Sequence, residues 1–115
     1  MTSEEKEPGR ELIIAPTARR DLLAIWDHIA ADNPEAADGM SDKLFDAFQQ
    51  RQLFPGSGRP RPELAGDRAL RFWHVGEYQI AYRVSENAVE IAAVLHGRRD
   101  IPAVFREREP GDAEE

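Results

Sequence analysis

The hydrophobic pattern of this chain changes its period once, and that change limits the folds the chain can adopt. In the first half, apolar residues recur every three or four positions, which places them on one side of a helix. They are Leu22, Ile25, Trp26 and Ile29, followed after a break by Ala37, Met40, Leu44 and Phe48. From Leu70 to Leu95 apolar and polar residues largely alternate, as in strands with one buried face. Helices followed by a run of strands predict an α+β fold.

Proline, glycine and capping residues mark the expected ends of the first elements. The apolar run Glu11–Ala15 predicts a buried strand that Pro16 ends, and Thr17 can cap a first helix. Asn33-Pro34 then restarts the chain, since asparagine is a good N-cap and proline suits the first helical position. Phe54-Pro55-Gly56 ends the second helix. So short a break between two helices predicts an antiparallel hairpin.

Tight turns divide the alternating region into three strands. Gly56–Asp67 is a loop rich in glycine, proline and arginine, and Gly76-Glu77 and Ser85-Glu86-Asn87 are the turns. The strands should form an antiparallel meander, and Asp100–Phe105 predicts a final short helical turn. We therefore expect an N-terminal strand, a helical hairpin and the meander. The hairpin should cover one face of a mainly antiparallel sheet.

Alternation assigns the strand residues to two faces of this sheet. The apolar face should meet the helices and carries Tyr78, Ile80, Tyr82, Val84, Val89, Ile91, Ala93 and Leu95. The opposite face is polar enough to be exposed or to hold a partner, and carries Arg71, Gln79, Arg83, Glu90 and His96.

Charge is distributed unevenly along the chain. The net charge of −7 argues at first against nucleic acid as a partner. Residues 51–106, however, hold nine arginines against six acids, whereas residues 11–50 hold eight acids against three bases. Arginine is suited to bidentate contacts with carboxylates and phosphates, so the second half is the better place for a binding surface.

The ends of the chain and its composition suggest one cytoplasmic domain. We expect a disordered acidic tail at residues 1–10, a single domain at 11–106 and an acidic tail at 107–115. The absence of cysteine excludes disulfides and thiolate zinc sites, and we expect neither a metal site nor a cofactor. No apolar run approaches the roughly 20 residues that span a bilayer, and the polar start lacks the features of a secretion signal.

Four segments, taken in order, resemble parts of one known protein family. The segment IWDHIAADNPEAAD (Ile25–Asp38) is similar to the family's helical hairpin, and LFPGSGRPRPEL (Leu53–Leu64) to the loop that follows it. The segment LRFWHVGEYQIAYRV (Leu70–Val84) resembles the central β-hairpin, and VEIAAVLHGRRDIPAVF (Val89–Phe105) the last strand and tail. Together they resemble the ParE branch of the RelE/ParE toxin superfamily. The resemblance runs from about Glu11 to Phe105 and is specific at the level of the superfamily.

The resemblance implies a function and two partners. It implies the toxin of a type II toxin–antitoxin system, of the plasmid stabilisation family, neutralised by an antitoxin encoded alongside. ParE-type toxins are associated with poisoning of DNA gyrase, whereas RelE-type relatives cut mRNA on the ribosome, and the fold alone does not choose between the two. We expect direct DNA binding only through the antitoxin, and no membrane partner.

The candidate catalytic residues favour binding over RNA cleavage. Cleavage needs a general base, a general acid and cations, and His96, Tyr82 and Arg83 could supply them. Alternation, however, puts Tyr82 on the opposite face from Arg83. No lysine lies in residues 44–115, whereas the RelE-type site is rich in lysine and arginine. We therefore favour a non-enzymatic toxin, with a ribosome-dependent mRNA endonuclease or a non-toxic stabilisation component as alternatives.

Nine residues are candidates for contacts with the antitoxin or the target. The sheet's polar face and the arginine loop offer cations to an acidic antitoxin segment, and an edge strand, either Glu11–Ala15 or the last of the meander, could accept an added strand. A basic and apolar patch near the C-terminus could contact the target. The candidates are Arg59, Arg61, Arg71, Arg83, His96, Arg98, Arg99, Ile101 and Phe105.

Three of the polar side chains also have simpler structural interpretations. Arg83 could make only a cross-strand ion pair with Glu90. His96 could close the strand end with a backbone hydrogen bond, and His74 could be a half-buried histidine on the face of Leu70 and Phe72.

Overall fold

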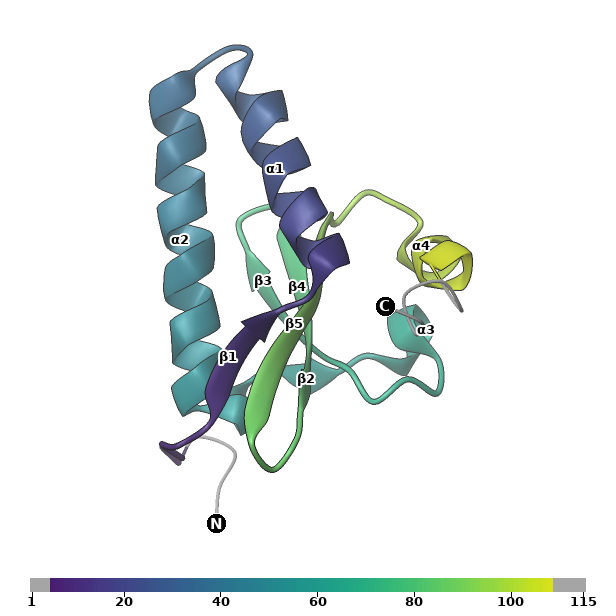
Figure 1. Cartoon of the computed structure of the whole chain (residues 1–115). Helices are drawn as coiled ribbons and strands as arrows, with labels where there is room; N and C mark the ends of the chain where they lie inside the picture. Colours follow the sequence, from purple (N-terminus) through teal and green to yellow (C-terminus); the bar gives the residue numbers. More distant parts are fainter. Residues whose placement is uncertain (1–4, 109–115) are drawn as a thin grey trace.

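The computed structural model describes residues 5–108, which form a helical hairpin on one face of a twisted sheet and two short helices on the other (Figure 1). The elements are β1 (Glu11–Ile14), α1 (Pro16–Ala30), α2 (Pro34–Leu53), a 3₁₀ turn (Pro55–Ser57), β2 (Arg59–Pro60), α3 (Pro62–Ala65), β3 (Arg71–Val75), β4 (Tyr78–Val84), β5 (Ala88–His96) and α4 (Ile101–Arg108). The expected α+β class, helical hairpin and three-stranded meander are confirmed.

The sheet has five strands in the order β1-β5-β4-β3-β2. Strand β1 runs parallel to β5, with Glu11 opposite Ala88, and the other pairs are antiparallel. The last strand of the meander, β5, therefore lies inside the sheet, and the expectation that it could be an edge is wrong. The edges are β1 and the two-residue strand β2, which lies in the segment expected to be only a loop.

The helical hairpin begins and ends largely where the punctuation predicted. Asn33 Oδ1 accepts a hydrogen bond from the Ala36 N–H at 3.1 Å, which confirms it as the N-cap of α2. Thr17 does not cap α1, because Pro16 already occupies the first turn and Ala15 is the N-cap. The buried Thr17 hydroxyl instead donates to the carbonyl oxygen of Ala92 on β5, at 3.4 Å.

A continuous apolar cluster fills the space between the hairpin and the sheet; we call this side the hairpin face. Its buried members are Ala18, Ile25, Leu44, Ala47, Phe48, Tyr78, Ile80, Tyr82, Val89, Ile91 and Val94. The cluster joins both helices to β4 and β5, and thus contains most of the residues expected on the apolar face. Val84, the last residue of β4, is the exception, because it is exposed.

A second apolar cluster covers the opposite side of the sheet, the α4 face. Its buried members are Ala65, Leu70, Phe72, Ala81, Ala93, Leu95, Ile101, Val104 and Phe105. The expectation that this side is a polar, open surface is therefore wrong along much of its length. Helices α3 and α4 lie over it (Figure 1).

A β-bulge explains why two strand residues were assigned to the wrong face. Ala81 pairs with Ala93 and Tyr82 with Ile91, so β5 has one extra residue, Ala92, at this point. An extra residue reverses the alternation that follows it. Ala93 and Leu95 consequently point to the α4 face instead of the helices.

The same register corrects two polar residues. Arg71 lies opposite Tyr82, and therefore on the hairpin face, because the turn at Gly76-Glu77 pairs Val75 with Tyr78. His96 follows the bulge and lies opposite Tyr78, also on the hairpin face. Of the five polar residues expected on the face opposite the helices, Gln79, Arg83 and Glu90 lie there, on the α4 face.

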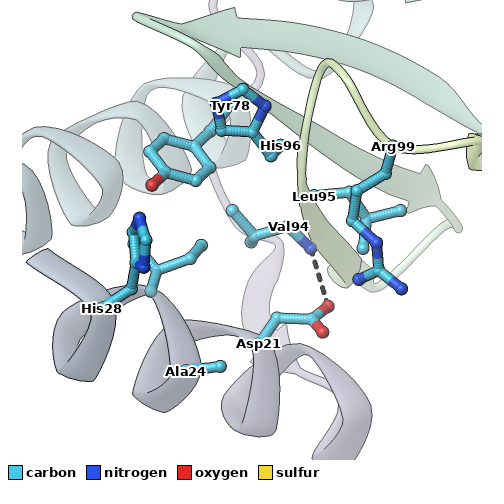
Figure 2. A pocket seen from close by; sticks show the side chains of 9 residues that line it. Asp21, Ala24, His28, Tyr78, Val94, Leu95, His96 and Arg99 are labelled. Carbon is cyan, nitrogen blue, oxygen red and sulfur yellow. Dashed lines mark hydrogen bonds between the residues drawn. The ribbon is translucent and has the colours of Figure 1, made fainter.

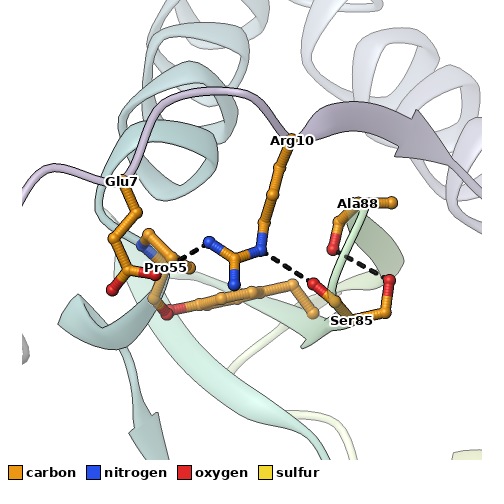
Figure 3. A network of polar contacts seen from close by, with 6 residues as sticks. Glu7, Arg10, Pro55, Ser85 and Ala88 are labelled. Atoms are coloured by element: carbon orange, nitrogen blue, oxygen red, sulfur yellow. Dashed lines mark hydrogen bonds and ion pairs between the residues drawn. The ribbon is translucent and has the colours of Figure 1, made fainter.

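The segment before β1 is anchored to the domain (Figure 3). Arg10 Nε donates to the carbonyl oxygen of Ser85 at 2.7 Å, and Arg10 Nη1 lies 2.9 Å from Glu7 Oε1. The Glu7 N–H donates to the Leu53 carbonyl oxygen at 2.7 Å. The expected tail at residues 1–10 thus has two anchoring points within it, and its residues 1–4 lie outside the described part.

At the other end, the final helical turn is longer than expected. Asp100 Oδ1 accepts from the Ala103 N–H at 3.2 Å, as a capping residue does, and α4 continues through Arg108. Two residues of the tail expected at 107–115 therefore belong to α4, and residues 109–115 lie outside the described part. None of the described helices is long and apolar enough to cross a membrane.

Candidate functional site

The nine candidate residues do not form one surface. Two lie at the β2 edge, three on or beside the sheet, two in an exposed turn and two in the interior. We describe these locations in turn, and then an apolar groove that the sequence patterns did not reveal.

Arg59 and Arg61 lie at the β2 edge, beside a pocket of about 440 Å³. The residues that line this pocket, which we call the β2-edge pocket, are Ser57, Arg59, Arg61, Phe72, Trp73, His74 and Gln79. Arg61 Nε pairs with Glu63 Oε2, a hydrogen bond that lowers the pKa of this fully exposed carboxyl group. His74 is exposed, so the expectation that it is half-buried is wrong.

Tyr82 fixes the loop that leads into β2. Its hydroxyl group accepts from the Gly58 N–H and donates to the Pro55 carbonyl oxygen, both at 2.8 Å. Arg71 Nη1 donates to the Gly58 carbonyl oxygen at 2.7 Å, so this candidate residue holds the loop in place. Burial raises the pKa of Tyr82, against the opposing effects of the Gly58 hydrogen bond and of nearby Arg51 and Arg71.

Arg51 is a residue that no motif indicated. Its side chain lies under the Trp73 ring, with the guanidinium carbon 3.6 Å from the ring centroid, and only 6% of the residue is exposed. Burial lowers the pKa of Arg51, and its Nε and Nη1 have no hydrogen-bond partner within residues 5–108. One signal could have revealed it: Arg51 continues the buried stripe of α2, three residues after Phe48.

Arg83 makes the cross-strand ion pair that its position suggested. Its Nε lies 3.4 Å from Glu90 Oε1; the Arg83 side chain is exposed and that of Glu90 is half-buried. Such a pair contributes at most about 1 kcal/mol to stability, so Arg83 is available to a partner at little cost.

His96 closes the end of β5, and this prediction is confirmed. Its Nδ1 accepts from the Arg98 N–H at 3.0 Å, which requires an unprotonated Nδ1. The Nε2 atom therefore carries the hydrogen and donates to Glu77 Oε1 at 2.8 Å. Tyr78 packs edge-on against the His96 ring, and burial together with the Glu77 carboxylate raises the pKa of Tyr78.

A pocket of about 290 Å³ lies beside His96 (Figure 2). His28 and Tyr78 lie at one side of it and Arg99 at the other. Asp21, from α1, accepts the Val94 N–H at 3.0 Å, because β1 has already ended and leaves this donor of β5 without a strand partner. Arg108 of α4 makes a bidentate contact with the same carboxylate, at 2.6 and 3.0 Å.

The C-terminal patch is only partly on the surface. Arg98 and Arg99 are exposed in the turn after β5. Ile101 and Phe105 are buried in the second apolar cluster, where Phe105 contacts the Phe72 ring edge-on, so they are not available as surface contacts. The sequence pattern could not show that Ile101 and Phe105 are buried while Arg98 and Arg99 are exposed. These residues lie outside the strands, so strand alternation does not apply to them.

An apolar groove lies between the two helices of the hairpin and the end of β1; we call it the hairpin groove. It has a volume of about 410 Å³ and is lined by Ile14, Arg19, Leu22, Leu23, Trp26, Ser41 and Phe45. Leu23 is 68% exposed and Phe45 43% exposed, which is unusual for large apolar side chains beside one another. Trp26 is held in place by a hydrogen bond from its Nε1 to Asp38 Oδ1, at 3.0 Å.

The described pockets differ in the kinds of side chain that line them. No group of three or more histidine, aspartate or glutamate side chains within residues 5–108 is placed to hold a metal ion. The pockets combine arginine and aromatic side chains or are largely apolar, as in surfaces that bind proteins or anions.

Comparisons with known proteins identify the fold and the family. A search among curated proteins gave no significant match. A solved structure described as a chromosomal ParDE TA system from P. aeruginosa superimposes with a TM-score of 0.65. That likeness has 21% sequence identity and covers 76% of this chain and 96% of that chain, so it shows a shared fold. The sequence model of the family described as the ParE toxin of type II toxin-antitoxin system, parDE, matches residues 12–101. Because this match spans most of the chain, the protein belongs to the ParE toxin family.

Proposed function

We propose that the chain is the toxin of a type II toxin–antitoxin pair and acts in the cytoplasm by binding DNA gyrase, without catalysing a reaction. We further propose that a cognate antitoxin neutralises it. Membership of the ParE family supports the toxin role. The association of ParE-type toxins with gyrase supports the target.

The observation that carries the non-enzymatic part is the separation of the three candidate catalytic side chains. Tyr82 is buried, and its hydroxyl group is held by Gly58 and Pro55. Arg83 pairs across the strands with Glu90, whereas His96 lies opposite Tyr78, five positions away along β4 and therefore about 17 Å distant. An acid, a base and a cation must meet at one phosphate to cleave RNA, so this geometry favours binding.

The hairpin groove is the surface that we assign to the antitoxin. Its exposed Leu23, Trp26 and Phe45 favour a segment with an apolar stripe, and Arg19 at its rim favours an acidic residue in that segment. Ile14 lies both in the groove and in β1, whose outer edge is open. An antitoxin segment could therefore add to β1 and continue into the groove. Without it, we expect the exposed groove to make the isolated toxin self-associate.

The exposed arginines are the residues that we assign to the target. Arg98 and Arg99 lie in a turn at one end of β5, and Arg83 on the open part of the α4 face. They are strong donors to carboxylates on a partner protein. Arg59 and Arg61 lie at the β2 edge and form a separate group.

The test is induced expression in the absence of antitoxin, combined with a supercoiling assay on purified gyrase. We expect filamentous cells, a DNA-damage response and loss of supercoiling. The variant R83Q/R98Q/R99Q should lose at least ten-fold in potency if these side chains contact gyrase. The variant R19Q/R20Q/K43Q is the matched control, because it also removes three exposed positive charges, which lie on the hairpin away from those arginines.

Each alternative function has its own signature in the same experiment. Unaffected supercoiling at saturating protein would disprove the gyrase proposal. Rapid translation arrest with cleaved mRNA would show an endonuclease instead, and the absence of any growth defect would indicate a non-toxic stabilisation component. Equal potency of the arginine variant and its control would show that these three arginines do not contact the target.

A further inference from the structure

We propose that the pocket of about 290 Å³ beside His96, which we call the β5-end pocket, binds a glutamate within an extended peptide of a partner protein. The peptide backbone bonds to Val94 and His96, and the glutamate carboxylate bonds to Arg99. This goes beyond the proposed function, since contact with gyrase through exposed arginines requires neither a pocket nor open backbone groups. The edge of β5, the Arg99 side chain and the Tyr78 hydroxyl group support it in turn.

The end of β5 has an edge that no strand covers within residues 5–108. Strand β1 pairs with β5 only as far as Ile91. The Gly97 N–H donates to the Glu77 carbonyl oxygen at 2.7 Å, and hydrogen-bonded pairs alternate with non-bonded pairs along an antiparallel ladder. Val94 and His96 belong to the non-bonded pairs, so they direct their N–H and C=O groups away from β4 and toward this edge.

Two of these four backbone groups have partners, and two are open. Asp21 accepts the Val94 N–H at 3.0 Å, and the His96 carbonyl oxygen accepts from the Arg99 N–H at 3.0 Å. The Val94 carbonyl oxygen and the His96 N–H have no hydrogen-bond partner in the described part of the chain. A single residue of an added peptide has one N–H and one C=O for this pair. A free carboxylate has no hydrogen to donate to Val94, so the open acceptor favours a peptide.

Arg99 provides the charge that selects an acidic residue. Its side chain is exposed and makes no ion pair or hydrogen bond within residues 5–108, and Figure 2 shows it at one side of the pocket. Asp21 is the only acid among the described lining residues, and the bidentate contact with Arg108, at 2.6 and 3.0 Å, already compensates its charge. A guanidinium group forms strong hydrogen bonds with a carboxylate, so this side of the pocket favours an acidic side chain.

The Tyr78 hydroxyl group offers a further donor at the other side of the pocket. Tyr78 is only 7% exposed, and its hydroxyl group has no hydrogen-bond partner among the described residues. Figure 2 shows this group pointing toward the exposed ring of His28. Burial, together with the Glu77 carboxylate, raises the pKa of Tyr78, so the hydroxyl group keeps the hydrogen that it donates. A buried donor without a partner suits a second carbonyl oxygen of the peptide.

The size and the walls of the pocket favour one glutamate side chain. The volume of about 290 Å³ lies just below the range for small-molecule sites. Ala24 and Ile25 of α1 form an apolar wall, against which the methylene groups of a glutamate can pack. The shorter aspartate has one such group fewer.

The experiment titrates the isotope-labelled full chain with the peptide acetyl-glycyl-glutamyl-glycinamide and follows the amide signals by NMR. We expect saturable shifts of the His96 amide and of the Leu95 amide, which shares a peptide unit with the Val94 carbonyl group. The glutamine counterpart of the peptide should bind about ten-fold more weakly, because it lacks the charge. Propionate has the carboxylate but no peptide unit, and it should also bind at least ten-fold more weakly.

Variants test the side chains that the proposal assigns. R99Q should lose about ten-fold in affinity for the glutamate peptide. R98Q is the matched control, because Arg98 is an exposed arginine of the same turn that does not line the pocket, and it should bind as the parent does. Y78F removes only the hydroxyl group and should lose at least three-fold, after circular dichroism has shown that the variant is folded.

Equal affinity of R99Q and R98Q, or of the glutamate and glutamine peptides, would overturn the proposal. Shifts that leave the Leu95 and His96 amides unchanged would also overturn it. Propionate that binds as tightly as the peptide would identify a site for a free acid instead. The titration contains no gyrase, so its failure is distinguishable from failure of the proposed function, which the supercoiling assay measures.

Discussion

The two faces of the sheet are covered by elements of very different length. The hairpin face is covered by α1 with 15 residues and α2 with 20, and the α4 face by α3 with 4 residues and α4 with 8. Long helices with regular apolar stripes join distant parts of the sheet, whereas α4 is held by its own few apolar side chains and by Arg108. We therefore expect the hairpin face to determine global stability and the α4 face to open on its own.

The largest expected effect compares one buried phenylalanine from each face. Phe48→Ala should lower the free energy of unfolding by about 4 kcal/mol, since the residue is fully buried in the first cluster. Phe105→Ala removes a ring from the second cluster and should mainly release α4. Chemical denaturation measures the first effect, and hydrogen exchange of the α4 amides measures the second.

The comparison of the two faces would fail if both variants lost the same stability in one cooperative transition. Phe45→Ala is a useful control, because this ring packs against Phe48 but is 43% exposed. Its loss should cost much less than that of Phe48.

Asp21 connects the two faces, and its substitution should have the next largest effect. Asp21→Asn keeps an oxygen for the Val94 N–H but loses the charge that faces Arg108. We expect a loss of about 2 kcal/mol, as for a hydrogen bond between charged groups that are partly buried. Asp27→Asn, on the exposed side of the same helix, should leave stability unchanged. If α4 exchanges no faster in the Asp21 variant, the contact does not hold the helix.

Tyr82 belongs to the hairpin face, and its removal should have a smaller effect that depends on pH. Tyr82→Phe loses the bonds to Gly58 and Pro55 and should cost about 1 to 2 kcal/mol. Because burial raises the pKa of Tyr82 in the folded state, its contribution is complete below the unfolded pKa of about 10 and is lost as pH rises through the folded value. Urea unfolding at a series of alkaline pH values should show a shallower fall for the variant than for the parent. Parallel curves would show that Tyr82 does not control alkaline unfolding.

The smallest effect on stability is expected on the exposed part of the α4 face. Arg83→Gln breaks the ion pair with Glu90 and should change the free energy of unfolding by less than about 1 kcal/mol. A double-mutant cycle with Glu90→Gln measures the coupling. A larger coupling would show that this part of the sheet is less open to solvent than the structure indicates.

The helices and strands of the hairpin face could be predicted from hydrophobic periodicity and from the proline, glycine and capping residues. The stripe that ends at Phe48, the cap at Asn33 and the turn at Gly76-Glu77 follow from local rules, because each depends on near neighbours in the chain. The resemblance added the family, which the match over residues 12–101 confirms.

The α4 face and the site could not be derived in the same way. The bulge at Ala92 has no marker such as glycine, and it reversed the sides of Leu95 and His96. Arg51 and Asp21 depend on contacts with Trp73, Val94 and Arg108, which are distant in the sequence. A charged residue within an apolar stripe, as at Arg51, is the one local signal that could have been used.

The pairing of β1 with β5 has a consequence for protein synthesis. Glu11 lies opposite Ala88, so β1 cannot pair with β5 until Ala88 has been synthesised and has left the ribosome. At 5 to 20 residues per second the delay is roughly 4 to 15 s. During this interval the chain lacks β5 and, with it, the contacts that position Asp21 and Tyr82. A toxin that needs the finished sheet would therefore become active only after β5 has left the ribosome, which gives an antitoxin already present in the cell time to bind it.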